Sequence, residues 1–222
     1  RDAGGGDHRE TECPVSEDRG ARGMYWRRGV SSEELDLELQ ARCSLYHSSF
    51  PNYPQMWADK GWLMGVWCLG NMYRRANKST FYGAYPGNYL KRIMVLFPDA
   101  GRTLHLFSGT VHDQYTVDVN TTLHPSVVAH AHHLPFKCET FDLVLADPPY
   151  SPTDAEKYGF PMPVRRVVMH ELRHIITPSG WLVWLDTVRP MYRADDWQQV
   201  GAIAVTVSTN TRTRLASIFK PR

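Results

Sequence analysis

The sequence predicts an α/β protein built on a mostly parallel sheet of seven strands that ends in an antiparallel pair. Beyond Asn88, short apolar runs typical of buried strands alternate with polar loops and helical stretches. The last two runs, 201–207 and 214–219, are joined by a short polar turn, which favours an antiparallel pair. The 222 residues, 42% hydrophobic and 22% charged, suffice for one substantial core with an appendage.

The expected elements follow in order along the chain. Ser31 and Glu34 form a capping-box pattern that predicts a short helix ending near Cys43. The segment 46–85 mixes aromatic and basic residues, which suits stacking on bases and contact with phosphates, but an aromatic-rich helix packed on the core explains it equally well. The remaining expected elements are helices at 89–97 and 162–176 and strands at 103–107, 115–119, 127–131, 141–146, 181–185, 201–207 and 214–219.

Composition limits the class of protein. A net charge of +2 excludes a global basic field, so any contact with a polyanion must be local. The sequence has no secretory signal and no apolar run of about 18 residues. Its four cysteines form no C-x-x-C pair and are expected to be unpaired. We therefore expect a soluble cytoplasmic protein with no membrane partner, and the oligomeric state stays open.

The most informative segment is the apolar run 141–146, followed by Asp147-Pro148-Pro149-Tyr150. In open α/β sheets, ligands bind outside the carboxyl ends of the strands. An amino group on an aromatic ring is a poor nucleophile because its lone pair is delocalised. Asp147 and the Pro148 carbonyl are placed to accept its two N–H hydrogens, while the prolines hold the turn and Tyr150 offers a face for stacking. The four residues are the predicted catalytic centre; the alternative is a turn that only ends a strand.

This tetrapeptide resembles the D/N/S-P-P-Y/F/W motif of the S-adenosylmethionine-dependent amino-methyltransferases. Members of that family act on adenine N6 or cytosine N4 in DNA, and relatives act on RNA guanine or protein glutamine. The order of segments across residues 80–219 is similar too, in particular to that of small phage-associated DNA methyltransferases. The shared segments are Tyr82-Gly83-Ala84-Tyr85-Pro86, Leu106-Phe107-Ser108-Gly109-Thr110, Asp118, Leu134-Pro135-Phe136 and the Asp-Pro-Pro-Tyr motif.

The resemblance implies a Rossmann-like class I methyltransferase fold, S-adenosyl-L-methionine as cofactor and a nucleic acid as partner. DNA is the favoured substrate, and the Asp form of the motif favours adenine N6. The implied organisation has three parts: residues 1–30, expected to be disordered; residues 31–80, a helical and aromatic N-terminal extension; and residues 81–222, the catalytic domain.

The resemblance also implies a cofactor site. The loop with Phe107, Ser108 and Gly109 corresponds to the family's F/L-x-G-x-G, of which one glycine is present. Asp118 would bind the two ribose hydroxyls. Because only nine residues separate it from Gly109, a loop and not a helix must make this crossover. His130 stands where relatives carry an acid that contacts the adenine amino group; either its neutral imidazole accepts this bond, or the contact is lost or made by backbone atoms. Tyr82, Gly83 and Asp147 complete the predicted cofactor set.

Three patterns suggest a metal ion, but none is a complete metal site. His170-Glu171-Leu172-Arg173-His174 matches the H-E-x-x-H of zinc hydrolases, yet no His or Glu follows His174 as a third ligand. Apolar residues at helical spacing place both histidines on the solvent side. Weaker alternatives are His124 with His130 to His133, and Cys43 with His47 and Cys68. We expect no metal.

The substrate is less constrained. About 37 residues separate Gly109 from Asp147, too few for an inserted target-recognition domain. Contacts must then come from the segment 46–85, the loop 151–163 and the arginines Arg189, Arg193, Arg212 and Arg214. The alternatives are methylation of RNA, protein or a small molecule, and a catalytically inactive protein that keeps the fold.

Overall fold

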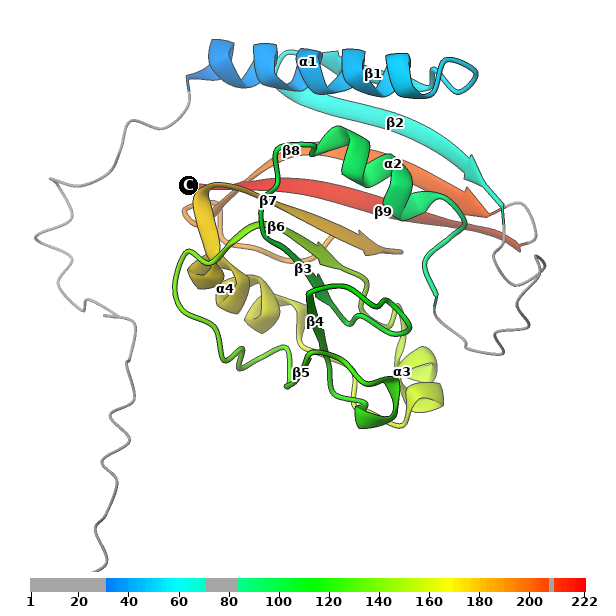
Figure 1. Ribbon diagram of the computed structural model, residues 1–222, viewed down its shortest axis with the longest axis vertical. Helices are drawn as coiled ribbons and strands as arrows, with labels where there is room; N and C mark the ends of the chain where they lie inside the picture. The colour runs from blue at the N-terminus through cyan, green and yellow to red at the C-terminus, as the bar shows by residue number, and fades with distance from the viewer. Residues whose placement is uncertain (1–30, 71–83, 208–209) are drawn as a thin grey trace, which may run out of the picture.

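The computed structural model describes residues 31–70, 84–207 and 210–222. Within these ranges nine strands form one sheet in the order β1-β2-β8-β9-β7-β6-β3-β4-β5 (Figure 1). The elements are α1 (Ser32–Ser49), β1 (Met56–Asp59), β2 (Trp62–Leu69), α2 (Tyr89–Leu96), β3 (Thr103–Leu106), β4 (Tyr115–Asp118), the 3-10 helix η2 (Thr121–Leu123), β5 (Val127–Val128), β6 (Phe141–Ala146), α3 (Pro152–Tyr158), α4 (Arg165–Ile175), β7 (Ile176–Asp186), β8 (Trp197–Val207) and β9 (Asn210–Pro221).

The sheet is mixed but mostly parallel, as predicted. Five of its pairings are parallel: β2 with β8, β3 with β4 and with β6, β4 with β5, and β6 with β7. The predicted antiparallel pair at the end of the chain is also confirmed, as β8 and β9. The predicted strand count of seven is wrong, because the hairpin of β1 and β2 adds two strands at one edge.

The sequence did not predict this hairpin because β2 is apolar on both faces. Its side chains alternate between exposed and buried, yet the exposed positions Trp62, Met64 and Val66 are as apolar as the buried ones. The polar and apolar alternation that marks a half-buried strand is therefore missing. Lys60 and Gly61 make the turn between the strands with φ of 50° and 74°, as in the type I′ turns of two-residue hairpins.

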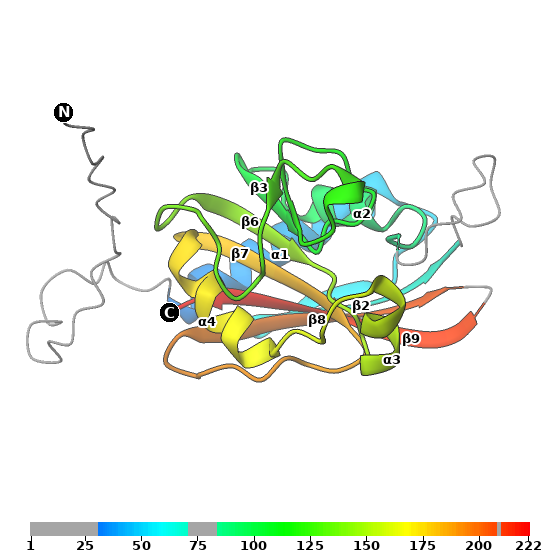
Figure 2. The same cartoon turned by 90° about the horizontal axis from the view of Figure 1, so that it is seen from below.

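Helices cover the sheet on both faces. α1 and α2 pack on one face, where Leu39 and Ile93 join a hydrophobic cluster with residues of β2, β7 and β8. α4 packs on the other face through Val168 and Leu172, against a cluster that includes residues of β3, β6 and β7 (Figures 1 and 2). This layering leaves the carboxyl ends of the central strands accessible.

Several predicted boundaries differ from the structure, among them those of β5, β8, β9 and α4, and at two positions tertiary contacts explain why the element is longer than predicted. α1 continues beyond Cys43 to Ser49 because Tyr46 is buried, with its ring stacked on Trp67 at a centroid distance of 5.6 Å. β7 begins at Ile176, directly after α4, although the sequence predicted a break at Pro178. The pairing with β6 is irregular at this point, and a proline is tolerated where the ladder is interrupted.

The parallel strands β3, β4 and β5 follow one another through loops. Residues 107–114 connect β3 to β4 without a helix, which confirms the predicted loop crossover, and only the short η2 lies between β4 and β5. Parallel neighbours are usually connected through an α-helix. These connections are therefore compact, and they place Gly109 next to the end of β4.

The described part of the predicted extension, 31–80, belongs to the core and is not an appendage. α1 packs on the hydrophobic cluster, and β1 with β2 extends the sheet. Residues 1–30, predicted to be disordered, lie outside the described residues. Cys43 and Cys68 are free thiols, but Cys138 is disulfide-bonded, so the expectation of unpaired cysteines is wrong at that position.

Among the described helices, none combines the length and the apolar character needed to cross a membrane.

Candidate active site

The candidate site lies where β3 and β6 end side by side. Leu106, the last residue of β3, pairs with Ala146, the last residue of β6. The chain leaves β3 toward β4 and β5 on one side and returns to β6 on the other, so this is a topological switch point of the sheet. Phe107 and Asp147 are the first residues beyond the two strands. The sequence therefore brings the loop 107–110 and the Asp-Pro-Pro-Tyr motif together at the edge where ligands of open α/β sheets bind.

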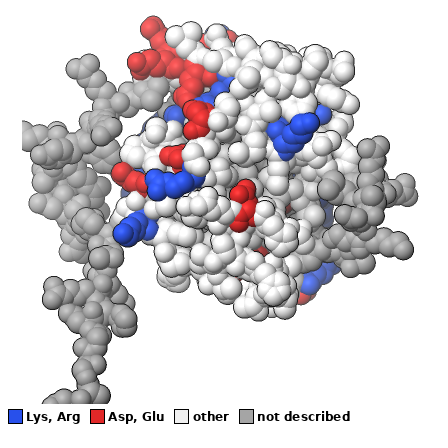
Figure 3. Space-filling view, viewed as in Figure 1, with Lys and Arg blue, Asp and Glu red and all other residues white. Residues whose placement is uncertain are grey.

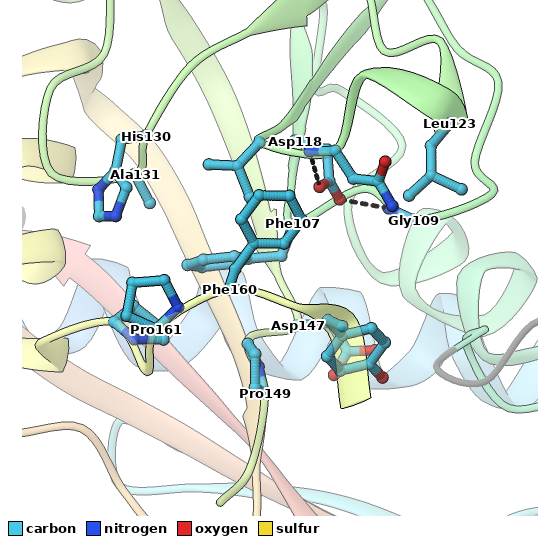
Figure 4. Close-up of a pocket in the computed structure, with 14 residues that line it drawn as sticks. Phe107, Gly109, Asp118, Leu123, His130, Ala131, Asp147, Pro149, Phe160 and Pro161 are labelled. Atoms are coloured by element: carbon cyan, nitrogen blue, oxygen red, sulfur yellow. Dashed lines mark hydrogen bonds between the residues drawn. The ribbon is translucent and has the colours of Figure 1, made fainter. Parts of the chain in front are cut away.

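A pocket opens at this position (Figure 4). It is lined by six of the predicted site residues, namely Phe107, Gly109, Asp118, His130, Asp147 and Pro149. Ser108, Pro148 and Tyr150 are described but do not line it. Tyr82 and Gly83 lie outside the described residues, so their predicted role stays a prediction.

The loop after β3 is strained. Phe107 has a φ of 58° and Gly109 a φ of 54°. Glycine adopts this left-handed conformation freely, but a bulky residue such as phenylalanine pays a steric penalty. The turn directs the Phe107 ring into the pocket, while Ser108 is buried and its Oγ has no partner among the described residues. Strain of this kind occurs preferentially in ligand-binding loops.

Asp118, at the end of β4, holds this loop in place. Its Oδ2 accepts a hydrogen bond from the Gly109 backbone N–H at 3.0 Å, and its Oδ1 accepts one from the Asn120 N–H at 2.9 Å (Figure 4). Each carboxylate oxygen has a second lone pair. Asp118 can therefore fix the loop and still accept hydrogen bonds from ligand hydroxyls in the pocket.

His130 lines the pocket, but its hydrogen bond changes its expected role. Its Nδ1 accepts from the His132 backbone N–H at 3.3 Å. In a neutral imidazole one nitrogen accepts and the other carries the proton, so Nε2 is then a donor. A donor does not replace the family's acidic acceptor. Of the two roles predicted for His130, loss of the contact to the adenine amino group fits this geometry.

Asp147 is a partly buried carboxyl with an altered pKa. Loss of solvent raises its pKa to about 7, although a hydrogen bond from Tyr150 and the positive charge of Arg214 both act to lower it. The Tyr150 hydroxyl donates to Oδ1 at 2.6 Å. A carboxyl with a pKa this far above its ordinary range, at a pocket, is typical of a functional group.

A buried ion pair fixes the turn that follows Asp147. Arg165 on α4 donates from Nε to Asp186 at 2.7 Å, and from Nη2 to the backbone carbonyl of Tyr150 at 3.2 Å. Asp186, at the end of β7, is fully buried and also accepts from the Trp184 indole at 3.2 Å. Removing one partner of such a network leaves an unpaired buried charge. Thus α4 and β7 together hold Tyr150 in position.

Residues 151–163, which the sequence predicted only as a loop available for substrate contact, form α3 and the segment after it, and they supply one wall of the pocket. Tyr158, Phe160, Pro161 and Pro163 line the pocket. The signal for α3 was present, because Ser151 followed by Pro152 is a typical helix start, and the Ser151 hydroxyl accepts from the Asp154 N–H at 3.1 Å. Asn120, just before η2, and Leu123, its last residue, also line the pocket, and no sequence motif predicted either of them.

The H-E-x-x-H pattern is placed on α4 away from the pocket. His170 is exposed, and its ring meets that of His174 edge to face at 4.9 Å. Glu171 accepts from the Leu134 backbone N–H at 2.7 Å, so it holds a loop. Within the described ranges no group of three or more His, Cys, Asp or Glu side chains is arranged to hold a metal ion.

Comparison with known proteins adds little to this picture. No family model matches the chain, and no curated protein matches it. Among solved structures, the chain is similar to the PH0226 protein from Pyrococcus horikoshii OT3, with 13% identity and a TM-score of 0.41, over 60% of this chain and 87% of that one. A likeness at this level carries no argument about fold or function.

Proposed function

We propose that this protein transfers a methyl group from S-adenosyl-L-methionine to the exocyclic amino group of a nucleic-acid base, with adenine N6 in DNA as the favoured target. The observation that carries the proposal is the placement of Asp147-Pro148-Pro149-Tyr150. The motif follows β6 at the switch point, and Asp147 lines the same pocket as Gly109 and Asp118.

The strand order supports a Rossmann-like class I methyltransferase fold. β5, β4, β3, β6 and β7 lie in the order 3-2-1-4-5 of doubly wound folds, with the switch point between the first and fourth strands of that scheme. β9 then runs antiparallel between β7 and β8. The two strands of the hairpin at the far edge are an addition to this pattern.

The pocket residues fit S-adenosyl-L-methionine. Asp118 would accept hydrogen bonds from the ribose hydroxyls, the backbone at Gly109 permits close approach, and Phe107 with Phe160 offers apolar walls for the adenine ring. When bound, the cofactor supplies a methyl group already activated by its sulfonium charge. The protein's task is then to orient the acceptor nitrogen.

Asp147 would orient that nitrogen. In its ionised form it accepts one N–H of the target amine, and the Pro148 carbonyl accepts the other. In the structure the Tyr150 hydroxyl occupies Oδ1, so the amine takes Oδ2 or displaces the hydroxyl. A base in a duplex must leave the helix to reach this site, where Tyr150 would stack on it.

Nucleic-acid contact would be local. On the face seen in Figure 3, acidic and basic side chains lie together along the left edge of the view, a few others stand singly, and most of the remaining surface carries no charge. This agrees with a net charge of +2 and gives no broad basic stripe on that face.

The test is transfer of tritium from labelled S-adenosyl-L-methionine to DNA, RNA and protein pools in parallel. We expect label in DNA, recovered after hydrolysis as N6-methyladenine. Label only in protein or RNA would move the proposal to another substrate, and no label in any pool would contradict it.

Asp147→Ala is the matched variant. It should abolish methyl transfer while leaving the affinity for S-adenosyl-L-methionine within a few-fold, because the hydrogen bond that orients the acceptor amine is lost while the other cofactor contacts remain. Calorimetry measures the affinity, and equal loss of cofactor binding and transfer would argue against this role.

A further inference from the structure

Arg214 lies against the Asp-Pro-Pro-Tyr motif and has unused hydrogen-bond donors. It sits on β9 opposite Val205 of β8, and its guanidinium carbon is 5.2 Å from the centroid of the Tyr150 ring. Its Nε and Nη1 are buried, and no described residue accepts a hydrogen bond from either. A buried charged donor without a partner is costly, so its presence beside the Asp-Pro-Pro-Tyr motif needs an explanation.

The other buried or partly buried arginines are engaged. Arg165 forms its pair with Asp186, and Arg42 donates to Leu96, Asp99 and Glu38. Arg92 donates to the Tyr46 hydroxyl at 2.6 Å. In Arg42 and Arg92 the buried nitrogen without a partner is Nε. Arg214 alone among these four donates to no described residue, and its guanidinium lies over the Tyr150 ring.

Tyr85 provides a second unused polar group in the same region. Its ring stacks on Tyr89 at a centroid distance of 5.2 Å, and its buried hydroxyl has no partner among the described residues. Burial, followed by the negative charge of Asp147, raises the pKa of both Tyr85 and Tyr89. Both tyrosines are thus within electrostatic range of Asp147, and both stay neutral donors.

These groups form a complementary set. Asp147 is an acceptor, and the unpaired N–H groups of Arg214 and the hydroxyl of Tyr85 are donors. The matching ligand edge carries an amino group next to a hydrogen-bond acceptor. In adenine the N6 amine is next to ring nitrogen N1, and in cytosine the N4 amine is next to ring nitrogen N3. An aliphatic amine has no such neighbour.

We propose that Arg214, assisted by Tyr85, binds the ring nitrogen adjacent to the target amino group, so that the site selects the amidine edge of a base. The proposal rests on the proposed function and adds a specificity residue to it. Arg214 recognises the ring nitrogen, and Asp147 recognises the amine. The pair holds the base by two neighbouring atoms and thereby fixes the direction of the amine.

The experiment deletes the ring nitrogen from the substrate. Wild type, Arg214→Met and the control Arg173→Met are assayed for methyl transfer to oligonucleotides that carry adenine or 1-deazaadenine at one position, and cytosine or 3-deazacytosine in a second pair. Arg173 is the matched control because its guanidinium donates only to the Arg222 carbonyl, at the far end of α4. Thermal unfolding checks that each variant is folded.

We expect wild type and Arg173→Met to lose roughly ten- to a hundredfold in kcat/KM on the deaza base that corresponds to the true target. Arg214→Met should lose a similar factor on the natural base and almost nothing further on the deaza base. Arg214→Lys should recover part of the loss, because it keeps a charged donor. Whether the adenine or the cytosine oligonucleotide is methylated shows which of the two bases is the target.

Equal rates for wild type on natural and deaza bases would overturn the inference while leaving the proposed function intact, and this comparison needs no variant to fold. A faster Arg214→Met enzyme would overturn it as well, because Arg214 would then obstruct the base. No transfer by wild type to either natural base would instead overturn the proposed function, and the inference with it.

Discussion

The protonation state of Asp147 controls whether it can accept a hydrogen bond from an amine. With a pKa of about 7, the carboxyl is mostly protonated below neutral pH. We predict that kcat/KM falls as the pH is lowered through about 7, approaching tenfold for each further unit. A rate that stays constant between about pH 5.5 and pH 8.5 would exclude Asp147 as the acceptor.

Tyr150→Phe tests whether the pKa of Asp147 sets this pH dependence. The Tyr150 hydroxyl donates to Asp147 and lowers its pKa, so removing it should raise the pKa and move the pH profile toward alkaline values. The aromatic face for stacking is retained. A profile that keeps its midpoint or moves toward acid would show that the hydrogen bond does not act on the group that limits the rate.

Asp118 combines cofactor binding with loop support. We expect Asp118→Ala to weaken S-adenosyl-L-methionine binding by about 1.5–3 kcal/mol, because charge-assisted hydrogen bonds to the ribose are lost. The bonds from Gly109 and Asn120 are lost too. Asp118→Asn is the control, since an amide oxygen still supports part of the loop. An unchanged dissociation constant for Asp118→Ala would place the ribose elsewhere.

At the scale of elements, the turn between β1 and β2 has an unfavourable residue. Lys60 is exposed and adopts a φ of 50° that asparagine or glycine tolerates better. Lys60→Asn should raise the free energy of unfolding by up to about 1 kcal/mol without changing activity. Gly61→Ala, at a φ of 74°, should lower it by a similar amount. Urea denaturation measures both changes. A destabilised Lys60→Asn variant would contradict the left-handed conformation assigned to residue 60.

The two histidines of α4 should be dispensable. His170 is exposed, His174 is partly exposed and neither lines the pocket, while Glu171 between them accepts a hydrogen bond from the Leu134 backbone N–H. We predict that the double Gln variant keeps its methyl-transfer activity and that purified protein carries no stoichiometric zinc. Elemental analysis finding about one zinc per chain, lost in the double variant together with activity, would reopen the hydrolase alternative.

For the molecule as a whole, the sequence predicted the central sheet well because its strands are short apolar runs between clear breaks. The limits of β6 agree with the prediction, and those of β3 and β4 differ by one residue. The prediction failed at β1 and β2, where exposed apolar side chains remove the alternation, and at β7, which continues through Pro178; β8 and β9 each begin four residues earlier than predicted. The errors lie where tertiary contacts outweigh local pattern.

The candidate site was predictable in part for the same reason. Gly109, Asp118 and Asp147 lie at or just beyond the ends of their strands, so topology alone brings them to one pocket. The role proposed for Arg214 depends on the register of β9 and on the absence of described hydrogen-bond acceptors for its buried Nε and Nη1. The tautomer of His130 depends on one backbone hydrogen bond. Properties of that kind are absent from a one-dimensional pattern.

The two strands at the edges of the sheet, β1 and β5, are short. β1 has four residues and β5 only two, whereas β7, β8 and β9, with eleven or twelve, are paired on both sides. Fibril growth and edge-to-edge aggregation need a long unpaired strand to which another chain can add. By enclosing its long apolar strands, the protein can carry a highly hydrophobic sheet with little tendency to polymerise through it.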